Sequence, residues 1–507
     1  MATSMARIAS RAQLGLHAPL VHVEVHLAAG LPAFNIVGLP ATAVKESKER
    51  VRAALLNSQF EFPAGRITVN LAPADVPKEG GRFDLPIALG ILLASQQLTL
   101  REDERTCEFY GELALSGELK PVKGLLLAAA HAAQEGHAMV VPRANADEAR
   151  IAAREQVCGA GHLLEVCELL RGVRTSGSGN SVLVANPKSG FDLDLRDVRG
   201  QIQAKRALAI AAAGTHSLLM VGPPGAGKSM LAQRLPGLLP PLTAAEALEV
   251  AMIASVSASG FDVRRFGQRP FRVPHHTASA QSIVGGGSHA RPGEASLAHN
   301  GVLFLDELPE FERRVLEGLR EPLETGVIAV SRASLQTEYP ASFQLITAMN
   351  PCPCGYFGDP SGRCTCPPGR IEKYRRRISG PLLDRIDLRI EVPALEAREL
   401  AAIHDDGRSS AEVAADVYAA RERQLARAGK LNSRLTVREL GEFCRLDTAG
   451  TQLLWHSEEH FHMTARGYHR TLRVARTIAD LEGSESIGAA HIAEAFQLKR
   501  ALEEPLC

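Results

Sequence analysis

The sequence has few of the features that mark membrane-embedded, secreted or charge-driven proteins. Its 57 Lys and Arg residues balance 57 Asp and Glu residues, which excludes a binder that works through bulk charge. No run approaches the roughly 18 apolar residues that a membrane span needs, and residues 1–16 lack the apolar core of a secretion signal. A neutral protein can still bind nucleic acid through a local basic strip.

Aromatic residues are scarce, at 5%, and only 9 of the 507 residues are cysteines. The hydrophobic share of 45% and the charged share of 22% are typical of globular proteins, so global disorder is excluded. At roughly 150 residues per domain, the length predicts about three domains. Clustered cysteines without a secretion signal indicate metal or reduced thiols, not a disulfide scaffold. We therefore expect a cytoplasmic protein with no membrane partner.

Three blocks follow one another along the chain. Residues 1–172 mix strand-like and helix-like runs, residues 191–393 alternate strands with helices, and residues 394–507 show helical patterns. The Gly/Ser-rich stretch 173–190 is typical of a linker. The first two blocks are of the α/β class, and the second predicts a parallel sheet with helices on both faces. Expected strands are 21–27, 66–71, 217–221, 301–305 and 344–349, and expected helices are 44–57, 85–95, 124–134, 200–214, 412–428, 436–444, 448–461, 465–482 and 487–500.

The most specific motif fits G-x-x-x-x-G-K-[ST] between an apolar strand and a helix. In such a loop the backbone N–H groups close around phosphates. We expect Lys228 to reach the β- and γ-phosphates of ATP and Ser229 to ligate Mg²⁺. The predicted nucleotide-binding residues are Gly222, Pro223, Pro224, Gly225, Ala226, Gly227, Lys228 and Ser229.

Polar residues end the next two strands of this block. Asp306 and Glu307 follow strand 301–305, where Asp306 is placed to hold Mg²⁺ through water and Glu307 to polarise the attacking water. A helix cap is the alternative role for such an Asp. Asn350 follows strand 344–349 and can sense the γ-phosphate, although an Asn at a strand end often only forms a turn.

The order of these motifs, followed by Leu-Leu-Asp-Arg-Ile-Asp at 382–387, resembles AAA+ ATPases of the magnesium-chelatase and minichromosome-maintenance branch. The resemblance makes Asn350 the sensor-1 residue and Arg385 an arginine finger that reaches a neighbouring subunit's γ-phosphate. Such a finger needs a partner subunit, and the resemblance implies a homo-hexameric ring. An ordinary salt bridge with Asp384 or Asp387 is the alternative for Arg385.

The segment 464–470 resembles the sensor-2 segment of a helical lid. The resemblance implies that Arg466 senses nucleotide. Arg470 and Arg473 are the alternatives, because they follow at the i+4 and i+7 positions of the same helix.

Two more segments resemble the same branch. Residues 271–293 look like a helix-2 insert, and residues 321–334 look like a pre-sensor hairpin with a short polar tip. Such elements point into the pore of ring helicases, which makes Arg332, Arg291 and His289 candidate DNA contacts. For each of these residues the alternative is an exposed, solvated turn.

Four cysteines, Cys352, Cys354, Cys364 and Cys366, follow directly after Asn350. Four thiolates can form a closed, tetrahedral Zn²⁺ site, although the C-x-C spacing is tighter than the usual C-x₂₋₄-C. The alternative is a loop packed by reduced thiols. A bound metal would be coupled to the nucleotide state, since Asn350 is adjacent.

The first block resembles the proteolytic domain of Lon-type proteases, a ribosomal S5-like fold, through residues 77–89 and 111–125. Arg82 falls where that family has its serine, and Leu126 falls where it has its lysine. A Ser–Lys dyad needs both groups within hydrogen-bond reach. We therefore expect a degenerate Lon-like domain that serves docking or DNA contact and not proteolysis.

The chain as a whole resembles the YifB/ComM family, which combines a Lon-like N-terminal domain, a magnesium-chelatase-like AAA+ core and a helical lid. The sequence segments 34–40 and 350–355 also resemble that family. The resemblance implies a hexameric, ATP-driven helicase on single-stranded or branched DNA, which drives branch migration during natural transformation and homologous recombination. A magnesium-chelatase-type ATPase subunit and an ATP-driven protein remodeller are the alternatives.

Overall fold

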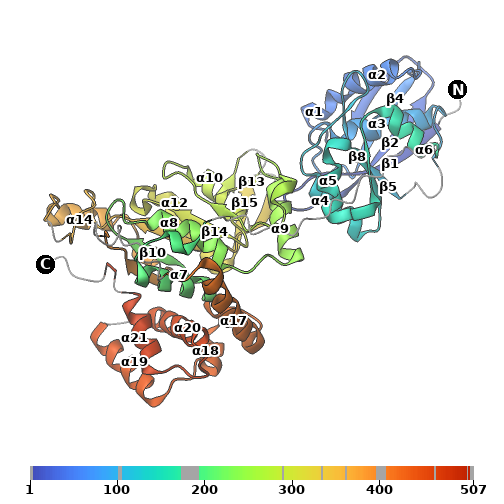
Figure 1. Cartoon of the computed structure of the whole chain (residues 1–507). Coiled ribbons are helices and arrows are strands. Elements are labelled where there is room, and N and C mark those ends of the chain that lie inside the picture. Colours follow the sequence, from blue (N-terminus) through green and yellow to red (C-terminus); the bar gives the residue numbers. More distant parts are fainter. Residues whose placement is uncertain are drawn as a thin grey trace.

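The computed structural model describes residues 4–100, 106–172, 193–287, 290–332, 335–359, 362–395, 407–461, 464–499 and 501–502 (Figure 1). The linker predicted at 173–190 lies outside these residues. Figure 1 shows the N-terminal domain at one end, the central domain in the middle, and the C-terminal helices packed beneath the central domain. Within the described ranges, no helix combines the length and apolar character needed to cross a bilayer.

The N-terminal domain is built on a seven-stranded mixed sheet in the order β3-β4-β2-β1-β5-β8-β9. Its second strand confirms the predicted alternation, because Val21, Val23 and Val25 are fully buried while their neighbours are partly exposed. The predicted helix 44–57 is split in two, since a new helix begins at Ser47. The strands are β1 (Ser4–Arg11), β2 (Leu20–Ala28), β3 (Ala33–Val37), β4 (Arg66–Ala72), β5 (Cys107–Phe109), β8 (Ala138–Pro142) and β9 (Val157–Ala160), with a small separate pair β6 (Glu112–Leu113) and β7 (Leu119–Lys120).

Helices of this domain pack on the sheet with almost wholly apolar buried faces. Helix α3 (Asp84–Ala94) is buried along nearly its whole length, because it lies between the sheet and α2 (Ser47–Asn57). The remaining helices are α1 (Thr42–Lys45), α4 (Leu125–Gln134), α5 (Ala146–Ala153) and α6 (Leu163–Leu170).

The central domain contains a five-stranded, all-parallel sheet in the order β11-β14-β17-β10-β18. Alternate residues of β10 serve the two faces: Leu218 and Met220 belong to one apolar cluster, Leu219 and Val221 to another. This confirms the predicted sheet with packing on both faces. The strands are β10 (Leu218–Val221), β11 (Phe271–Arg272), β14 (Val302–Leu305), β17 (Gln344–Met349) and β18 (Leu388–Glu391).

The helices and small strands of the central domain surround that sheet. A hairpin is present, since β15 (Val327–Arg332) and β16 (Leu335–Pro340) pair antiparallel. Its predicted bounds of 321–334 were wrong, because residues 320–325 form a helix and the second strand begins only at Leu335. The insert between the phosphate-binding loop and the Asp306–Glu307 pair contains β12 (Gly285–Gly286), β13 (Arg291–Pro292) and two short helices. The helices are α7 (Ile202–Gly214), α8 (Lys228–Arg234), α9 (Ala244–Ser255), α10 (Ala280–Val284), α11 (Glu294–Leu297), α12 (Arg313–Gly318), α13 (Arg320–Thr325), α14 (Pro368–Arg375) and α15 (Gly380–Leu383).

The third block is helical, as predicted. Capping boxes fix the starts of α17 (Ser410–Ala428) and α18 (Val437–Phe443), where Ser409 and Thr436 accept from the third helical N–H. The other helices are α19 (Thr448–Phe461), α20 (Ala465–Leu481) and α21 (Ala489–Gln497). Their apolar faces share one buried cluster with α7 and β10, so this domain packs directly on the central sheet.

The N-terminal domain contacts the central domain through α4, α5 and α9. The Ser255 hydroxyl donates to Glu148 over 2.8 Å, and the Lys123 ammonium donates to the Ala258 carbonyl over 3.2 Å. Gly15 also lies against Thr337 of β16, so closely that a side chain at Gly15 would collide with it. The N-terminal domain thus touches the hairpin as well as α9.

Candidate nucleotide-binding site

The phosphate-binding loop connects β10 to α8 at the carboxyl end of the sheet. Gly222 passes so close to the Val392 carbonyl that a Cβ atom would lie 2.1 Å from that oxygen, so only glycine fits there. Gly227, with φ at 89°, supplies the left-handed turn from which α8 begins. The loop and the start of the helix have the form of a phosphate cradle.

Lys228 is held by three oxygens in the structure. Its ammonium donates to the carbonyls of Gly222 and Pro223, over 2.7 and 2.9 Å, and to Asn350 Oδ1 over 3.2 Å. Burial lowers the pKa of Lys228, while the charges of Asp306 and Glu307 oppose that effect. The predicted sensor residue and the predicted phosphate-binding lysine are therefore in direct contact.

Ser229 and Asp306 also meet, as their predicted joint role requires. The Ser229 hydroxyl donates to Asp306 Oδ2 over 2.7 Å. Hydroxyl and carboxylate oxygens are the donors that Mg²⁺ prefers, so this pair fits that cation. Asp306 Oδ1 also accepts from the Glu307 backbone N–H over 2.9 Å.

Glu307 lies beside the same site in an unusual backbone conformation. Its φ of 53° is in the left-handed region, which costs energy for a non-glycine residue. Its carboxylate is 53% exposed and lies 3.1 Å from His276 Nδ1. His276 follows β11, the neighbour of β14, so the pairing of these strands brings the imidazole to the carboxylate.

Arg385 lies at the other end of the sheet, before β18. Its guanidinium is only 7% exposed, pairs with Glu324 over 2.6 Å and donates to the Pro381 carbonyl. Its buried Nε has no hydrogen-bond partner. Asp387, one of the two partners named as alternatives from the sequence, instead contacts His216 and Arg470.

The candidate sensor-2 residues gather around Arg385 and not around Lys228. Arg466 lies 3.7 Å from the same Glu324 oxygen, and Arg470 lies 3.3 Å from Asp387. Burial alone would raise the pKa of Asp387, but His216 and Arg470 outweigh it and hold that pKa below its usual range. A cavity of about 660 Å³ is lined by Arg385, Arg434, Arg466, Arg470 and Arg473.

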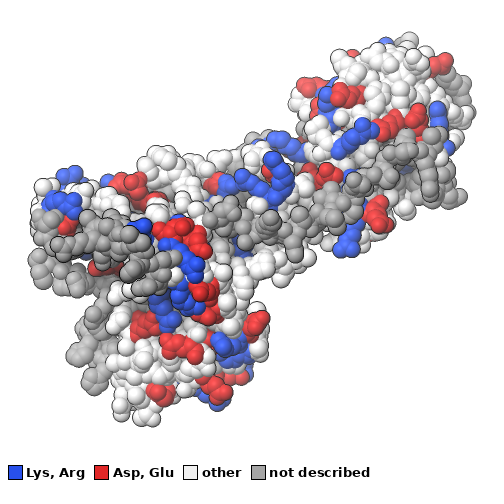
Figure 2. Space-filling model, in the orientation of Figure 1, with Lys and Arg blue, Asp and Glu red and all other residues white. Residues whose placement is uncertain are grey.

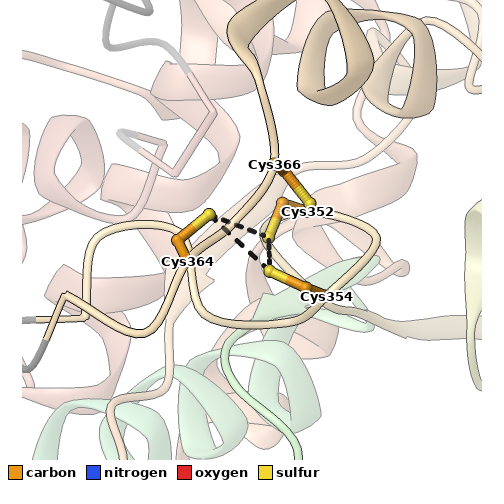
Figure 3. A group of neighbouring side chains, drawn as sticks. All are labelled: Cys352, Cys354, Cys364 and Cys366. Carbon is orange, nitrogen blue, oxygen red and sulfur yellow. Dashed lines mark hydrogen bonds between the residues drawn. The ribbon is translucent and has the colours of Figure 1, made fainter.

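The four cysteines also converge (Figure 3). Cys352, Cys354, Cys364 and Cys366 place their Sγ atoms within 4.8 Å of one another. The Tyr356 backbone N–H, followed by the Cys352 thiol, lowers the pKa of Cys354 to about 6.

The predicted DNA contacts lie on the insert and the hairpin. Arg291 is exposed on β13, whereas His289 lies outside the described residues. Arg332 ends β15 and pairs with Leu335, which puts it at the hairpin tip as predicted. Figure 2 shows Lys and Arg interspersed with Asp and Glu on the visible face, so any basic strip there is local.

In the N-terminal domain, Arg82 and Leu126 are buried core residues. Arg82 donates to the Lys123 carbonyl over 2.7 Å and to Gln13 Oε1 over 3.1 Å. Leu126 is fully buried in α4. Neither residue supplies a nucleophile or a base at the positions where a Ser–Lys dyad would stand.

Two residues near the sites had no role assigned from the sequence. His276 contacts Glu307, and Glu324 contacts both Arg385 and Arg466. No local sequence signal pointed to His276, because the pairing of β11 with β14 that brings it to Glu307 is seen only in the structure. Glu324 had none, because its partners are 61 and 142 residues away along the chain.

Three family models match successive parts of the chain. "Subunit ChlI of Mg-chelatase" covers residues 23–145, "Magnesium chelatase, subunit ChlI" covers 194–400, and "Magnesium chelatase, subunit ChlI C-terminal" covers 407–499. With the parallel sheet and the phosphate loop, they define a magnesium-chelatase-like AAA+ ATPase.

Full-length relatives narrow this class. Competence protein ComM of Haemophilus influenzae is 48% identical over 496 residues, which cover 97% of both chains. The YifB protein of Salmonella typhimurium is 49% identical over 98% of this chain and 97% of its own. The chain belongs to the ComM/YifB family, as the sequence motifs predicted. The magnesium-chelatase 38 kDa subunit of Cereibacter sphaeroides is a more distant relative, 25% identical over 58% of this chain and 86% of its own.

Proposed function

We propose that this chain is the subunit of a cytoplasmic, homo-hexameric ATPase that moves along single-stranded or branched DNA. Its proposed task is helicase and branch-migration activity while transforming DNA is integrated by homologous recombination. Membership of a family that includes a competence protein supports the proposed role in the integration of transforming DNA. The positions of the arginine-lined cavity and of the phosphate-binding loop support the proposal that the protein is a ring-shaped motor.

The observation that carries the proposal is the separation of the catalytic groups within one chain. Lys228 and Asp306 lie at the carboxyl end of the parallel sheet, whereas Arg385 and Arg466 line a cavity at its amino end. The four residues of β10 alone span about 13 Å. One subunit therefore cannot bring both sets to one nucleotide, but two neighbours in a ring can.

The proposed chemistry follows from the contacts of the phosphate loop. The γ-phosphate of ATP takes over the Lys228 ammonium from the Gly222 and Pro223 carbonyls, while Asn350 stays within reach. Ser229 and Asp306 would hold Mg²⁺, which offsets phosphate charge when bound. Glu307 would orient the water, and the neighbour's Arg385 would stabilise the charge of the transition state.

Glu324 is a candidate link between hydrolysis and movement. It pairs with Arg385 and Arg466, and its helix α13 leads directly into β15 of the hairpin. Once a neighbour's phosphate attracts Arg385, Glu324 loses the closer of its two partners and the base of the hairpin is free to shift. Arg332 at the hairpin tip and Arg291 of the insert are the proposed contacts to DNA phosphates.

A subunit-mixing experiment tests the shared site. Lys228→Ala and Arg385→Ala are each expected to lower ATP turnover about 100-fold or more. Mixed rings contain junctions where an intact Lys228 faces an intact Arg385, so mixing should restore a quarter to a half of normal turnover. Turnover that stays at the level of the single variants would contradict a site shared between subunits.

Stimulation by DNA tests the substrate. ATP turnover is measured alone and with single-stranded or branched DNA, with Lys228→Ala as the blank. Several-fold stimulation is expected, and Arg332→Ala or Arg291→Ala should each reduce the slope of log affinity against log salt by about 0.7 for single strands. An unchanged slope would remove that residue from the DNA path.

A magnesium-chelatase-type ATPase subunit, or another protein remodeller, is the second candidate. The three family models and the 38 kDa chelatase subunit favour it. ATP turnover that ignores DNA but rises with a protein partner would support this reading over the DNA motor.

A further inference from the structure

The loop that follows Asn350 brings four thiols into one small cluster. The Sγ atom of Cys352 lies 3.2 Å from that of Cys354 and 3.8 Å from that of Cys364, and the latter two are 3.6 Å apart. Cys366 completes the group within 4.8 Å (Figure 3). A tetrahedral zinc with Zn–S bonds near 2.3 Å requires S···S distances of about 3.8 Å. The distances of 3.6 and 3.8 Å match that spacing, and the distance of 3.2 Å between Cys352 and Cys354 is shorter.

Disulfides do not account for this arrangement. A disulfide joins two sulfurs at about 2.05 Å and leaves them no third or fourth partner. Here three Sγ–Sγ distances of 3.2 to 3.8 Å connect three thiols in a triangle, and the fourth lies beside them. Four sulfurs arranged around one point are the donor set of a thiophilic cation.

The backbone around the thiols is arranged as a support for thiolate ligands. The Gly355 N–H donates to the Cys352 carbonyl over 3.0 Å and closes a turn, and the Phe357 N–H points at Cys352 Sγ over 3.3 Å. The Phe357 N–H stabilises a negative charge on the Cys352 sulfur and holds that sulfur in place. The Arg375 guanidinium covers the Phe357 ring at 5.2 Å and donates to the Pro351 carbonyl.

The same loop rests on the phosphate-binding loop. Gly355 has φ at 86°, and a Cβ atom there would lie 2.6 Å from Pro224 Cδ. Asn350, which contacts Lys228 at 3.2 Å, precedes the first two cysteines by only two and four residues. Whatever fixes the cysteine loop therefore also fixes the positions of Asn350 and Pro224.

We propose that Cys352, Cys354, Cys364 and Cys366 bind one Zn²⁺ ion as a closed, structural site that braces Asn350 and Pro224 against the phosphate loop. Four protein ligands leave no open position, so the ion has no role as a Lewis acid. Its effect on hydrolysis is positional. The proposal needs only the cluster and its contacts, and it holds whether or not DNA is the substrate.

Metal analysis of the full-length protein, purified without added metal or chelator, is the first test. We expect one zinc per chain, released when a mercurial reagent blocks the thiols. Growth with cobalt should give the visible absorption of a tetrahedral tetrathiolate centre. A folded protein without metal, whose four thiols all react at once with a thiol reagent, would overturn the proposal.

The double variant Cys364→Ser/Cys366→Ser gives the second test, with Cys158→Ser as its control. Cys158 is half-buried in β9, away from the cluster. The double variant should lose its zinc and lower ATP turnover about 10- to 100-fold, and the control should keep both. Zinc retained by the double variant would refute the assignment.

Removal of zinc from the wild-type chain tests the proposal even if the double variant misfolds. Mercurial release followed by reducing agent and chelator should lower ATP turnover, and added Zn²⁺ should restore it with one ion per chain. Full turnover without zinc would show that the ion does not brace the site. Stimulation by DNA is measured in a separate assay. The effect of zinc on basal ATP turnover can therefore be interpreted even if DNA proves not to be the substrate.

Discussion

The central and N-terminal domains each bury one basic side chain, Lys228 and Arg82, yet they hold it in different ways. Lys228 and Arg82 are only 8% and 7% exposed. Lys228 contacts two loop carbonyls and Asn350 at the edge of a sheet, where phosphate oxygens can replace those partners. Arg82 is enclosed by Gln13 and the Lys123 carbonyl, which belong to the domain's own core. A buried cation serves chemistry only where a ligand can replace its partners.

The carboxylates of the two domains repeat this contrast. Asp84 is fully buried, pairs with Arg50 over 2.6 Å and accepts from the Leu113 backbone N–H over 3.2 Å. Asp306 is partly exposed and accepts hydrogen bonds from the short Ser229 side chain and from the next backbone N–H. The first carboxylate is used for packing, and the second retains free lone pairs for a cation.

The largest expected effect concerns the two cations. Lys228→Ala should reduce ATP turnover about 10²- to 10³-fold, because it removes a charge aimed at the transferred phosphate. Arg82→Gln should leave turnover within about twofold of normal, since Arg82 touches no group of the nucleotide site. Parallel turnover assays of the two purified variants check this. A similar loss in both would break the contrast between the domains.

The next largest effects are expected at the two carboxylates. Replacing Asp84 should mainly lower stability, and replacing Asp306 should mainly lower activity. Asp84→Asn should lower the free energy of unfolding by about 3 kcal/mol, because it breaks the ion pair between the fully buried Asp84 carboxylate and the partly exposed Arg50. Asp306→Asn should abolish most turnover with a far smaller change in stability. The urea midpoint of the first unfolding transition and the ATP turnover of each variant provide the comparison. Equal midpoints for the two variants would contradict it.

A smaller loss of stability is expected for Arg82→Gln itself. The shorter side chain leaves the Lys123 carbonyl and the Gln13 amide oxygen without their donor, at a cost of about 1–3 kcal/mol. The same urea titration measures it. A midpoint identical to that of the unaltered chain would mean that Arg82 is not part of the core network.

The smallest effect tests how easily partners are exchanged at the nucleotide site. His276→Ala frees Glu307, and because an exposed pair of this kind contributes at most about 1 kcal/mol, basal turnover should rise no more than about fivefold. His275→Ala is the matched control, since His275 bonds Thr277 and packs on the His276 ring but has no ion pair with Glu307 among the described residues. Turnover that falls in the His276 variant would show that the imidazole assists Glu307.

Much of the nucleotide site was predictable because its parts are local in sequence. The phosphate loop, the pair Asp306 and Glu307, and Asn350 each end one strand, and parallel strands bring their carboxyl ends to one edge. The hairpin was expected from the family resemblance, but its bounds were wrong, since residues 320–325 form a helix. The split after Lys45 was missed, since both pieces continue one helical pattern. The contacts of Glu324 and His276 were missed because they join distant segments.

The sequence by itself determined the class of the protein, its family and the position of the candidate phosphate-binding loop, because short-range spacing encodes loops, strand ends and caps. Only the tertiary structure decided which groups share a site. It put Arg466 beside Arg385 and Glu324, away from Lys228, and it gathered the four cysteines against the phosphate loop. Such juxtapositions depend on how separate elements pack, and packing is set by the whole core and by no single segment.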